Sequence, residues 1–202
     1  MKMSFLQQLQ TKRKALKATA TTVTTASGKR FIEANATTST PIHQLPEQCY
    51  GFVVDTNPDT TPACILTDFL YLGSQDAVNS ENISAYKLTH ILSVGIETPH
   101  LVDEKVHTKF LPCLDLPETV LLERVIPAAN QFIVDAALSR GRVLVHCNAG
   151  VSRAASIVIA YLILVCGMPF DVAYALVKSK RECIQPNIGF IKQLKQLKLD
   201  AV

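Results

Sequence analysis

The stretch Val143-Leu144-Val145-His146-Cys147-Asn148-Ala149-Gly150-Val151-Ser152-Arg153 decides the expected fold of this chain. Its first residues are apolar or β-branched and predict a buried strand, which Gly150 interrupts in a tight loop. The long apolar run after Arg153 predicts a helix. A strand, a short loop and a helix N-terminus gather backbone N–H groups around one point, where an anion can bind. The stretch therefore predicts an anion-binding loop.

The segments around this stretch alternate between the patterns of strands and helices. Strands are predicted at 63–66, 69–72, 89–94, 108–114 and 142–146, and helices at 122–138, 153–165 and 171–179. Asp171 is the expected N-cap of the third of these helices, and Pro186 with Asn187 opens a last one. This order predicts an α/β fold with a central, mostly parallel, twisted sheet flanked by helices.

Composition and charge exclude several classes of protein. The 202 residues are 48% hydrophobic and 18% charged, as in an ordinary globular protein. A formal charge of +3 without a basic stripe argues against nucleic acid as a partner. The longest uncharged run, 154–170, is short and contains Pro169, which favours a buried helix over a membrane span.

The six cysteines form no CxxC pair and no zinc-type spacing. We therefore expect no metal site. Reduced thiols and the lack of a secretory signal favour an intracellular, cytoplasmic location, with the nucleus as an alternative. Cys113 is open to two interpretations: a buried structural thiol, which is the default, or a partner that captures oxidised Cys147 as a disulfide.

Cys147 and Arg153, at the two ends of the loop, suit phosphate ester chemistry. A thiol among N–H groups at a helix N-terminus is expected to be a thiolate, which can attack phosphorus and form a cysteinyl-phosphate. The planar guanidinium of Arg153 can bind two phosphate oxygens. The expected substrate-binding residues are Asn148, Ala149, Gly150, Val151 and Ser152, with His146 orienting the loop through hydrogen bonds.

The leaving oxygen needs a proton, so a general acid is expected at the end of a neighbouring strand. Asp115 is the best candidate, because it closes an apolar strand and begins an exposed Asp-Leu-Pro-Glu turn. Glu118 is the weaker alternative. The same carboxylate would later activate the water that hydrolyses the intermediate. This chemistry needs no cofactor.

These residues resemble the cysteine-based protein tyrosine phosphatase superfamily, whose signature is His-Cys-x5-Arg. More narrowly, residues 145–153 are similar to the loop of the small atypical dual-specificity phosphatases, and 70–74, 89–94 and 186–194 resemble other motifs of that group. The resemblance implies a tyrosine phosphatase-like fold with Cys147 as nucleophile, Arg153 as phosphate clamp and Asp115 as acid. It also implies hydrolysis of phosphotyrosine and of phosphoserine or phosphothreonine in proteins, and a role in MAP kinase (stress kinase) signalling.

One residue departs from the family pattern. The superfamily usually has Ser or Thr directly after the arginine, where the hydroxyl stabilises the departing thiolate, and this chain has Ala154. We therefore expect slow hydrolysis of the intermediate.

Two other functions remain open beside the active phosphatase. Because of Ala154, a phosphoprotein-binding scaffold with weak catalysis is the first alternative function. A phosphoinositide or RNA 5′-phosphatase is less favoured, because residues 148–152 contain no lysine for additional phosphates. Lys178, Lys180 and Arg181 either flank the site and favour acidic phosphopeptides, or form a solvated helix end.

Residues 1–61 differ from the expected catalytic domain, 62–202. They are rich in Thr and basic, and Glu33 is the only acidic residue among the first 40. A partly disordered extension is the favoured interpretation, and a mitochondrial transit peptide is the alternative. The stretch Lys12-Arg13-Lys14-Ala15-Leu16 also resembles the basic-then-apolar peptides that dock on MAP kinases.

Overall fold

The computed structural model describes residues 20–24, 30–34, 43–44, 59–97 and 105–197. The chain divides into two units, Met1–Gln48 and Cys49–Val202. In the first, β1 (Ala20–Thr24), β2 (Arg30–Ala34) and β3 (His43–Gln44) form an antiparallel sheet in that order. The sequence reasoning proposed no strand here, although Thr, Val, Ile and Phe all favour strands. The domain boundary expected after residue 61 and the partial disorder of the extension stay predictions.

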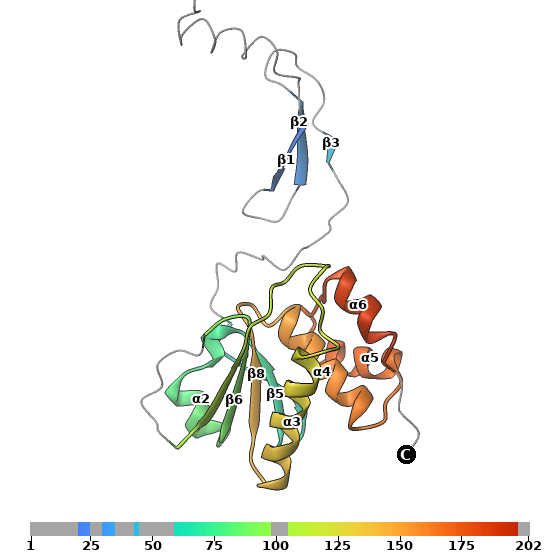
Figure 1. Cartoon of the computed structure of the whole chain (residues 1–202). Helices are drawn as coiled ribbons and strands as arrows, with labels where there is room; N and C mark the ends of the chain where they lie inside the picture. The colour runs from blue at the N-terminus through green and yellow to red at the C-terminus, as the bar shows by residue number, and fades with distance from the viewer. Residues whose placement is uncertain (1–19, 25–29, 35–42, 45–58, 98–104, 198–202) are drawn as a thin grey trace, which may run out of the picture. The chain divides into compact units, whose positions relative to one another are not determined.

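The second unit is organised around a five-stranded sheet with the order β4-β5-β8-β6-β7. Its strands are β4 (Ala63–Leu66), β5 (Leu70–Gly73), β6 (His90–Val94), β7 (His107–Leu111) and β8 (Val143–His146). Only β4 runs antiparallel to its neighbour, and the remaining pairs are parallel. This confirms the mostly parallel sheet. The strand before Cys147 is central, so the loop that follows it lies between the ends of β5 and β6 (Figure 1).

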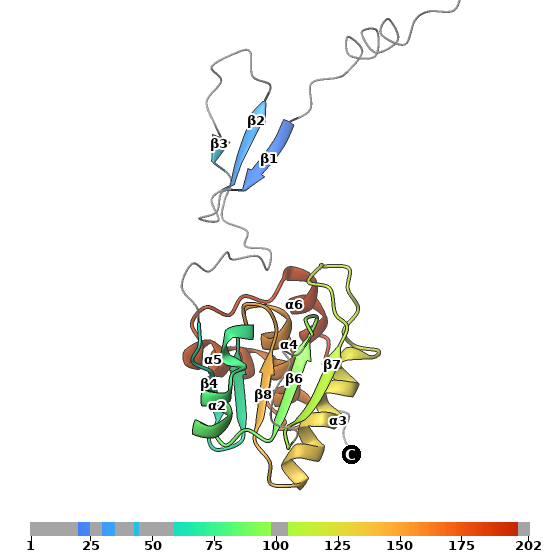
Figure 2. The ribbon, with the colours of Figure 1, turned by 90° about the vertical axis from the view of Figure 1, so that its left-hand side faces the viewer.

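Helices cover both faces of this sheet. The short η1 (Gln75–Ala77) and α2 (Ser80–Ala85) lie on one face. The other face carries α3 (Val125–Leu138), α4 (Arg153–Leu164), α5 (Phe170–Lys180) and α6 (Ile188–Leu194), as Figures 1 and 2 show. Residues 154–163 of α4 are all buried, which agrees with a core helix. Among the described residues, no helix is long and apolar enough to cross a bilayer.

Proline explains three of the differences between the predicted and the observed ends of the elements. β7 ends at Leu111 rather than at residue 114, because Pro112 cannot donate a hydrogen bond to a ladder. α3 begins at Val125 rather than at residue 122, and this start places Pro127 in the first turn, where no N–H is needed. Pro169 is the N-cap of α5, so the expected cap, Asp171, lies in its first turn instead.

Candidate active site

The loop of residues 147–152, the anion loop, connects β8 to α4 and is mostly buried. Cys147 is only 2% exposed. Gly150 has φ +64, and a Cβ there would lie 2.4 Å from the carbonyl oxygen of Gly73 on β5. Glycine is therefore required at this turn, as expected, and the structure identifies its close neighbour as the Gly73 backbone.

Hydrogen bonds hold the outer side of the anion loop. Its consecutive carbonyls at residues 148, 149, 150 and 151 accept from Gln75 N–H at 2.9 Å, Arg181 Nη2 at 2.9 Å, Arg181 Nε at 3.0 Å and Gln185 N–H at 2.8 Å. In a trans peptide the N–H points away from the carbonyl of the same unit. The N–H groups of residues 149–152 are therefore directed to the inner side of the loop, where they can bind an anion.

His146 lies at the end of β8 beneath this loop and is fully buried. Its Nδ1 is 3.4 Å from the Cys147 carbonyl, and its Nε2 is 2.6 Å from Ser93 Oγ. A carbonyl only accepts, so Nδ1 carries the proton, and the Ser93 hydroxyl donates to Nε2. Burial lowers the pKa of His146 to about 4, which leaves the ring neutral at pH 7. These contacts suit a residue that orients the loop.

Arg153 begins α4 and reaches back over the ends of two strands. Its Nη1 donates to the Gly95 carbonyl at 2.8 Å, directly after β6. A Cβ at Gly95, whose φ is +70, would lie 2.4 Å from that nitrogen. The Nε of Arg153 is buried and has no hydrogen-bond partner among the described residues. Arg153 is thus fixed at one nitrogen and has another available for a substrate oxygen.

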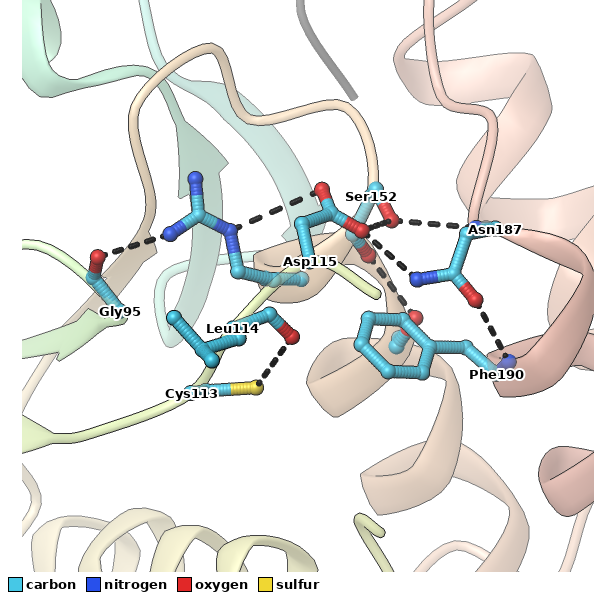
Figure 3. Close-up of polar contacts among 9 residues, drawn as sticks. Gly95, Cys113, Leu114, Asp115, Ser152, Asn187 and Phe190 are labelled. Carbon is cyan, nitrogen blue, oxygen red and sulfur yellow. Dashed lines mark hydrogen bonds and ion pairs between the residues drawn. The ribbon is translucent and has the colours of Figure 1, made fainter. Parts of the chain in front are cut away.

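Asp115 lies against the anion loop, beside Ser152 and Asn187 (Figure 3). Its Oδ1 accepts from Ser152 Oγ and from Asn187 Nδ2, both at 2.7 Å. Its Oδ2 is 3.7 Å from Arg153 Nε, and the side chain is only 7% exposed. The structure therefore places Asp115 against Arg153 and against Ser152 of the loop that begins at Cys147. Asp115 was expected at the end of a strand next to β8, but it follows β7, which pairs with β6. The predicted roles of the three residues stay predictions. Glu118, the alternative acid, is exposed.

Three residues of this site were missed or misassigned from the sequence. Gly95 was not singled out, although a glycine directly after a predicted strand was a usable indication. Asn187 was assigned only to the start of the last helix, and it does cap α6 by accepting from Phe190 N–H at 3.0 Å. Arg181 was placed in a solvated or substrate-flanking helix end, and this is wrong, because it is 7% exposed and bonded to the anion loop.

Cys113 is buried beside the site, and its Sγ lies 3.7 Å from the Leu114 carbonyl. Burial raises the pKa of this thiol to about 11, against a smaller lowering by Arg153. A protonated, buried thiol reacts slowly. This favours the structural interpretation of Cys113 over a redox partner. No group of three or more potential metal ligands lies together in the described ranges.

Comparison with known proteins agrees with this geometry. Residues 70–199 match the family model described as dual specificity phosphatase, catalytic domain. The chain is 38% identical over 185 residues to mouse dual specificity protein phosphatase 19, covering 89% of this chain and 83% of that protein. The crystal structure of DUSP15 is 32% identical with a TM-score of 0.61, covering 67% of this chain and 85% of that one.

A second solved structure is equally similar. The human tyrosine phosphatase-like serine/threonine/tyrosine-interacting protein is 31% identical with a TM-score of 0.61, covering 67% of this chain and 93% of that one. These likenesses confirm the protein tyrosine phosphatase-like fold. The chain belongs to the dual specificity phosphatase family, and it is a protein phosphatase that acts on phosphotyrosine and on phosphoserine or phosphothreonine.

Proposed function

We propose that Cys147, Arg153 and Asp115 carry the hydrolysis of the phosphate ester through a cysteinyl-phosphate intermediate. The observation that supports this most strongly is the contact of Asp115 with the anion loop through Ser152 and through Arg153. It brings an acid next to the loop that begins at the nucleophile. The inward N–H groups of residues 149–152 supply the site for the phosphate oxygens.

In the first step the thiolate sulfur of Cys147 attacks phosphorus in line with the ester oxygen. The S–P bond forms as the P–O bond breaks, and protonated Asp115 gives its proton to the leaving oxygen. Arg153 Nε, which has no hydrogen-bond partner among the described residues, donates to an equatorial oxygen, and the guanidinium follows the equatorial oxygens as phosphorus flattens in the transition state. The loop N–H groups share the remaining negative charge.

In the second step water attacks the cysteinyl-phosphate, and the Asp115 carboxylate takes the proton from that water. Inorganic phosphate leaves, and the thiolate of Cys147 is restored. Two serine hydroxyls near the loop are already used, because Ser152 donates to Asp115 and Ser156 donates to the Ser152 carbonyl at 2.8 Å. With Ala154 buried between them, no hydroxyl among these residues is left for the departing sulfur. This supports a slow second step.

Turnover of p-nitrophenyl phosphate by the full chain tests the proposed chemistry. Cys147→Ser is expected to lower the rate by about three orders of magnitude or more, because a hydroxyl is not ionised at pH 7. Cys166→Ser is the matched control, since it changes an exposed thiol on the same chain and is expected to leave the rate unchanged. Retention of activity in Cys147→Ser would refute the nucleophile.

The second candidate is a phosphoprotein-binding scaffold with weak catalysis. Ala154 favours it, and one of the similar structures belongs to a protein that is itself called phosphatase-like and interacting. An assay of the wild-type chain distinguishes the two candidate functions. A scaffold would bind a phosphotyrosyl peptide and leave it phosphorylated, whereas the enzyme releases the dephosphorylated peptide in an initial burst and inorganic phosphate only as the cysteinyl-phosphate is hydrolysed.

We also propose that the substrates belong to a MAP kinase (stress kinase) cascade and that the chain works in the cytoplasm. The support is the basic-then-apolar stretch Lys12-Arg13-Lys14-Ala15-Leu16, which lies outside the described residues. Replacing its three basic residues by Ala should weaken binding to a purified MAP kinase and leave p-nitrophenyl phosphate turnover unchanged. Equal binding by both chains would remove the support for this partner.

A further inference from the structure

We propose that Arg181 and Asp59 form a clamp that holds the anion loop in its binding shape. Asp59 lies 11 residues before residue 70, where the family match begins. The clamp would make the segment that precedes the family match a part of the active site. This proposal rests on the function proposed above for the loop.

Arg181 follows directly after α5 and is almost completely buried. Its Nε donates to the Gly150 carbonyl at 3.0 Å and its Nη2 to the Ala149 carbonyl at 2.9 Å. The same Nη2 pairs with the Asp59 carboxylate. One rigid guanidinium thus joins two consecutive loop carbonyls to a carboxylate from a distant part of the chain.

For the loop to bind an anion, these two carbonyl oxygens must point to its outer side. They belong to the turn at Gly150, where φ is +64. If either carbonyl rotated inward, its oxygen would repel the phosphate, and the N–H of the next residue would leave the site. Arg181 opposes that rotation without touching substrate, and its charge also raises the potential around the loop. It is therefore a positioning residue.

Asp59 is held from a second side. Its carbonyl accepts from Ser74 Oγ at 2.7 Å, and Ser74 lies directly after β5 and caps η1. The Asp59 carboxylate offsets the charge of a guanidinium that would otherwise be buried without a counterion. The sheet, the segment at residue 59 and the anion loop are thus linked through the side chains of Ser74, Asp59 and Arg181.

A matched pair of arginine substitutions in the full chain tests the clamp. Arg181→Lys keeps the charge but loses the planar guanidinium that donates to both loop carbonyls. It is expected to lower kcat/KM by about a hundredfold because the loop is misplaced. Arg142→Lys is the control, since Arg142 also joins an aspartate, Asp68, to a carbonyl, that of Tyr86, at the opposite end of β8. It should leave kcat/KM unchanged. Equal kcat/KM for both variants and wild type would overturn the clamp.

Asp59→Ala separates positioning from charge and serves if Arg181→Lys does not fold. Loss of a carboxylate beside the loop would by charge alone strengthen the binding of inorganic phosphate. The clamp predicts the opposite, a weakening of about fivefold. Stronger or equal binding would contradict it.

Phosphate binding is best measured by calorimetry in a Cys147→Ser background, where turnover plays no part. Loss of phosphate affinity there on adding Arg181→Lys supports the clamp even if the proposed nucleophile is wrong. Unchanged affinity there refutes the clamp even if Cys147 is the nucleophile. Failure of the clamp and failure of the proposed function are thus distinguishable.

Discussion

The two loops that build the active site are held in opposite ways. The anion loop, residues 147–152, is bonded along its backbone, and four consecutive carbonyls have donors. The acid loop, residues 112–120, alternates between exposed positions and positions that are partly or fully buried, and it presents Leu114, Leu116 and Val120 to solvent. Its contact with the site is through the side chain of Asp115.

The difference matches what each loop has to do. The anion loop must present several N–H groups at fixed points, and reorganisation during the reaction would raise the barrier. Asp115 must instead give a proton in one step and take one in the next, so its hydrogen bonds need to be exchanged for contacts with substrate and water. Changes in the acid loop should therefore affect proton transfer, and changes in the anion loop should affect anion binding and stability.

The largest effect is expected from Asp115→Asn. The amide cannot give a proton, so kcat for a phosphothreonyl peptide should fall by about a thousandfold. For p-nitrophenyl phosphate, whose leaving group needs less help, the loss should be clearly smaller.

Glu118→Gln provides the control in the same loop. Glu118 is exposed, and its replacement should leave kcat for both substrates unchanged. Equal losses for the two substrates in Asp115→Asn would indicate a binding role and remove Asp115 as the acid.

The next effect concerns His146, beneath the anion loop, and it is a change in the free energy of unfolding. Burial lowers the pKa of His146 to about 4 from its ordinary 6.5, so between these values the unfolded chain binds a proton that the folded chain excludes. The free energy of unfolding should therefore rise with pH from about 4 to about 6.5, with a His146 contribution of about 3 kcal/mol, all of it present above pH 6.5. Urea unfolding at several pH values measures it.

A variant with a side chain that does not titrate isolates this contribution. His146→Gln should be less stable than the wild type at pH 7. Its free energy of unfolding should also change less with pH between 4 and 6.5. His90→Gln is the comparison, since His90 is only partly buried and carries a smaller lowering of its pKa. If the free energy of unfolding of His146→Gln rose with pH as steeply as that of the wild type, the buried His146 ring could not be the source of the rise.

A smaller loss of kcat is expected from a substitution at Ser152, where the two loops meet. Ser152→Ala removes one of the two donors to Asp115 Oδ1 and leaves Asn187 in place. The acid should be less well positioned, and kcat should fall by about fivefold with little change in KM. Ser139→Ala, which removes a hydroxyl bonded to Ala136 at the far end of α3, should leave kcat unchanged. A change in KM alone would assign Ser152 to anion binding.

The comparison of the loops also explains which parts of the site could be predicted from the sequence. The strand, the turn at Gly150 and the helix after Arg153 follow from local patterns, because periodicity and a glycine act within a few residues. Asp115 was predicted at the end of a strand next to β8, whereas the strand before it, β7, is separated from β8 by β6. Its predicted role as acid stays a prediction.

The supports of the anion loop could not be predicted in this way. Gly95 lies 58 residues from Arg153, which it holds, and Arg181 and Asn187 lie 31 and 35 residues from the loop residues that they contact. Nothing in a basic helix end distinguishes an exposed arginine from a buried one bonded to carbonyls. The order β5-β8-β6 brings Gly95 to the site, and the packing of α5 and α6 against α4 brings Arg181 and Asn187 there. Both depend on long-range packing.

The smallest effect is a gain, at the one position of the anion loop region that departs from the family pattern. Ala154→Ser supplies a hydroxyl that can donate to the departing thiolate, and it should raise steady-state kcat by about threefold while shrinking the phosphoenzyme burst. Ala155→Ser is a matched control, since Ala155 is equally buried on the same turn of α4. Rapid-quench kinetics on the full chain measures both quantities. A wild type without a burst, or equal gains from both serines, would show that hydrolysis of the intermediate is not limited by the missing hydroxyl.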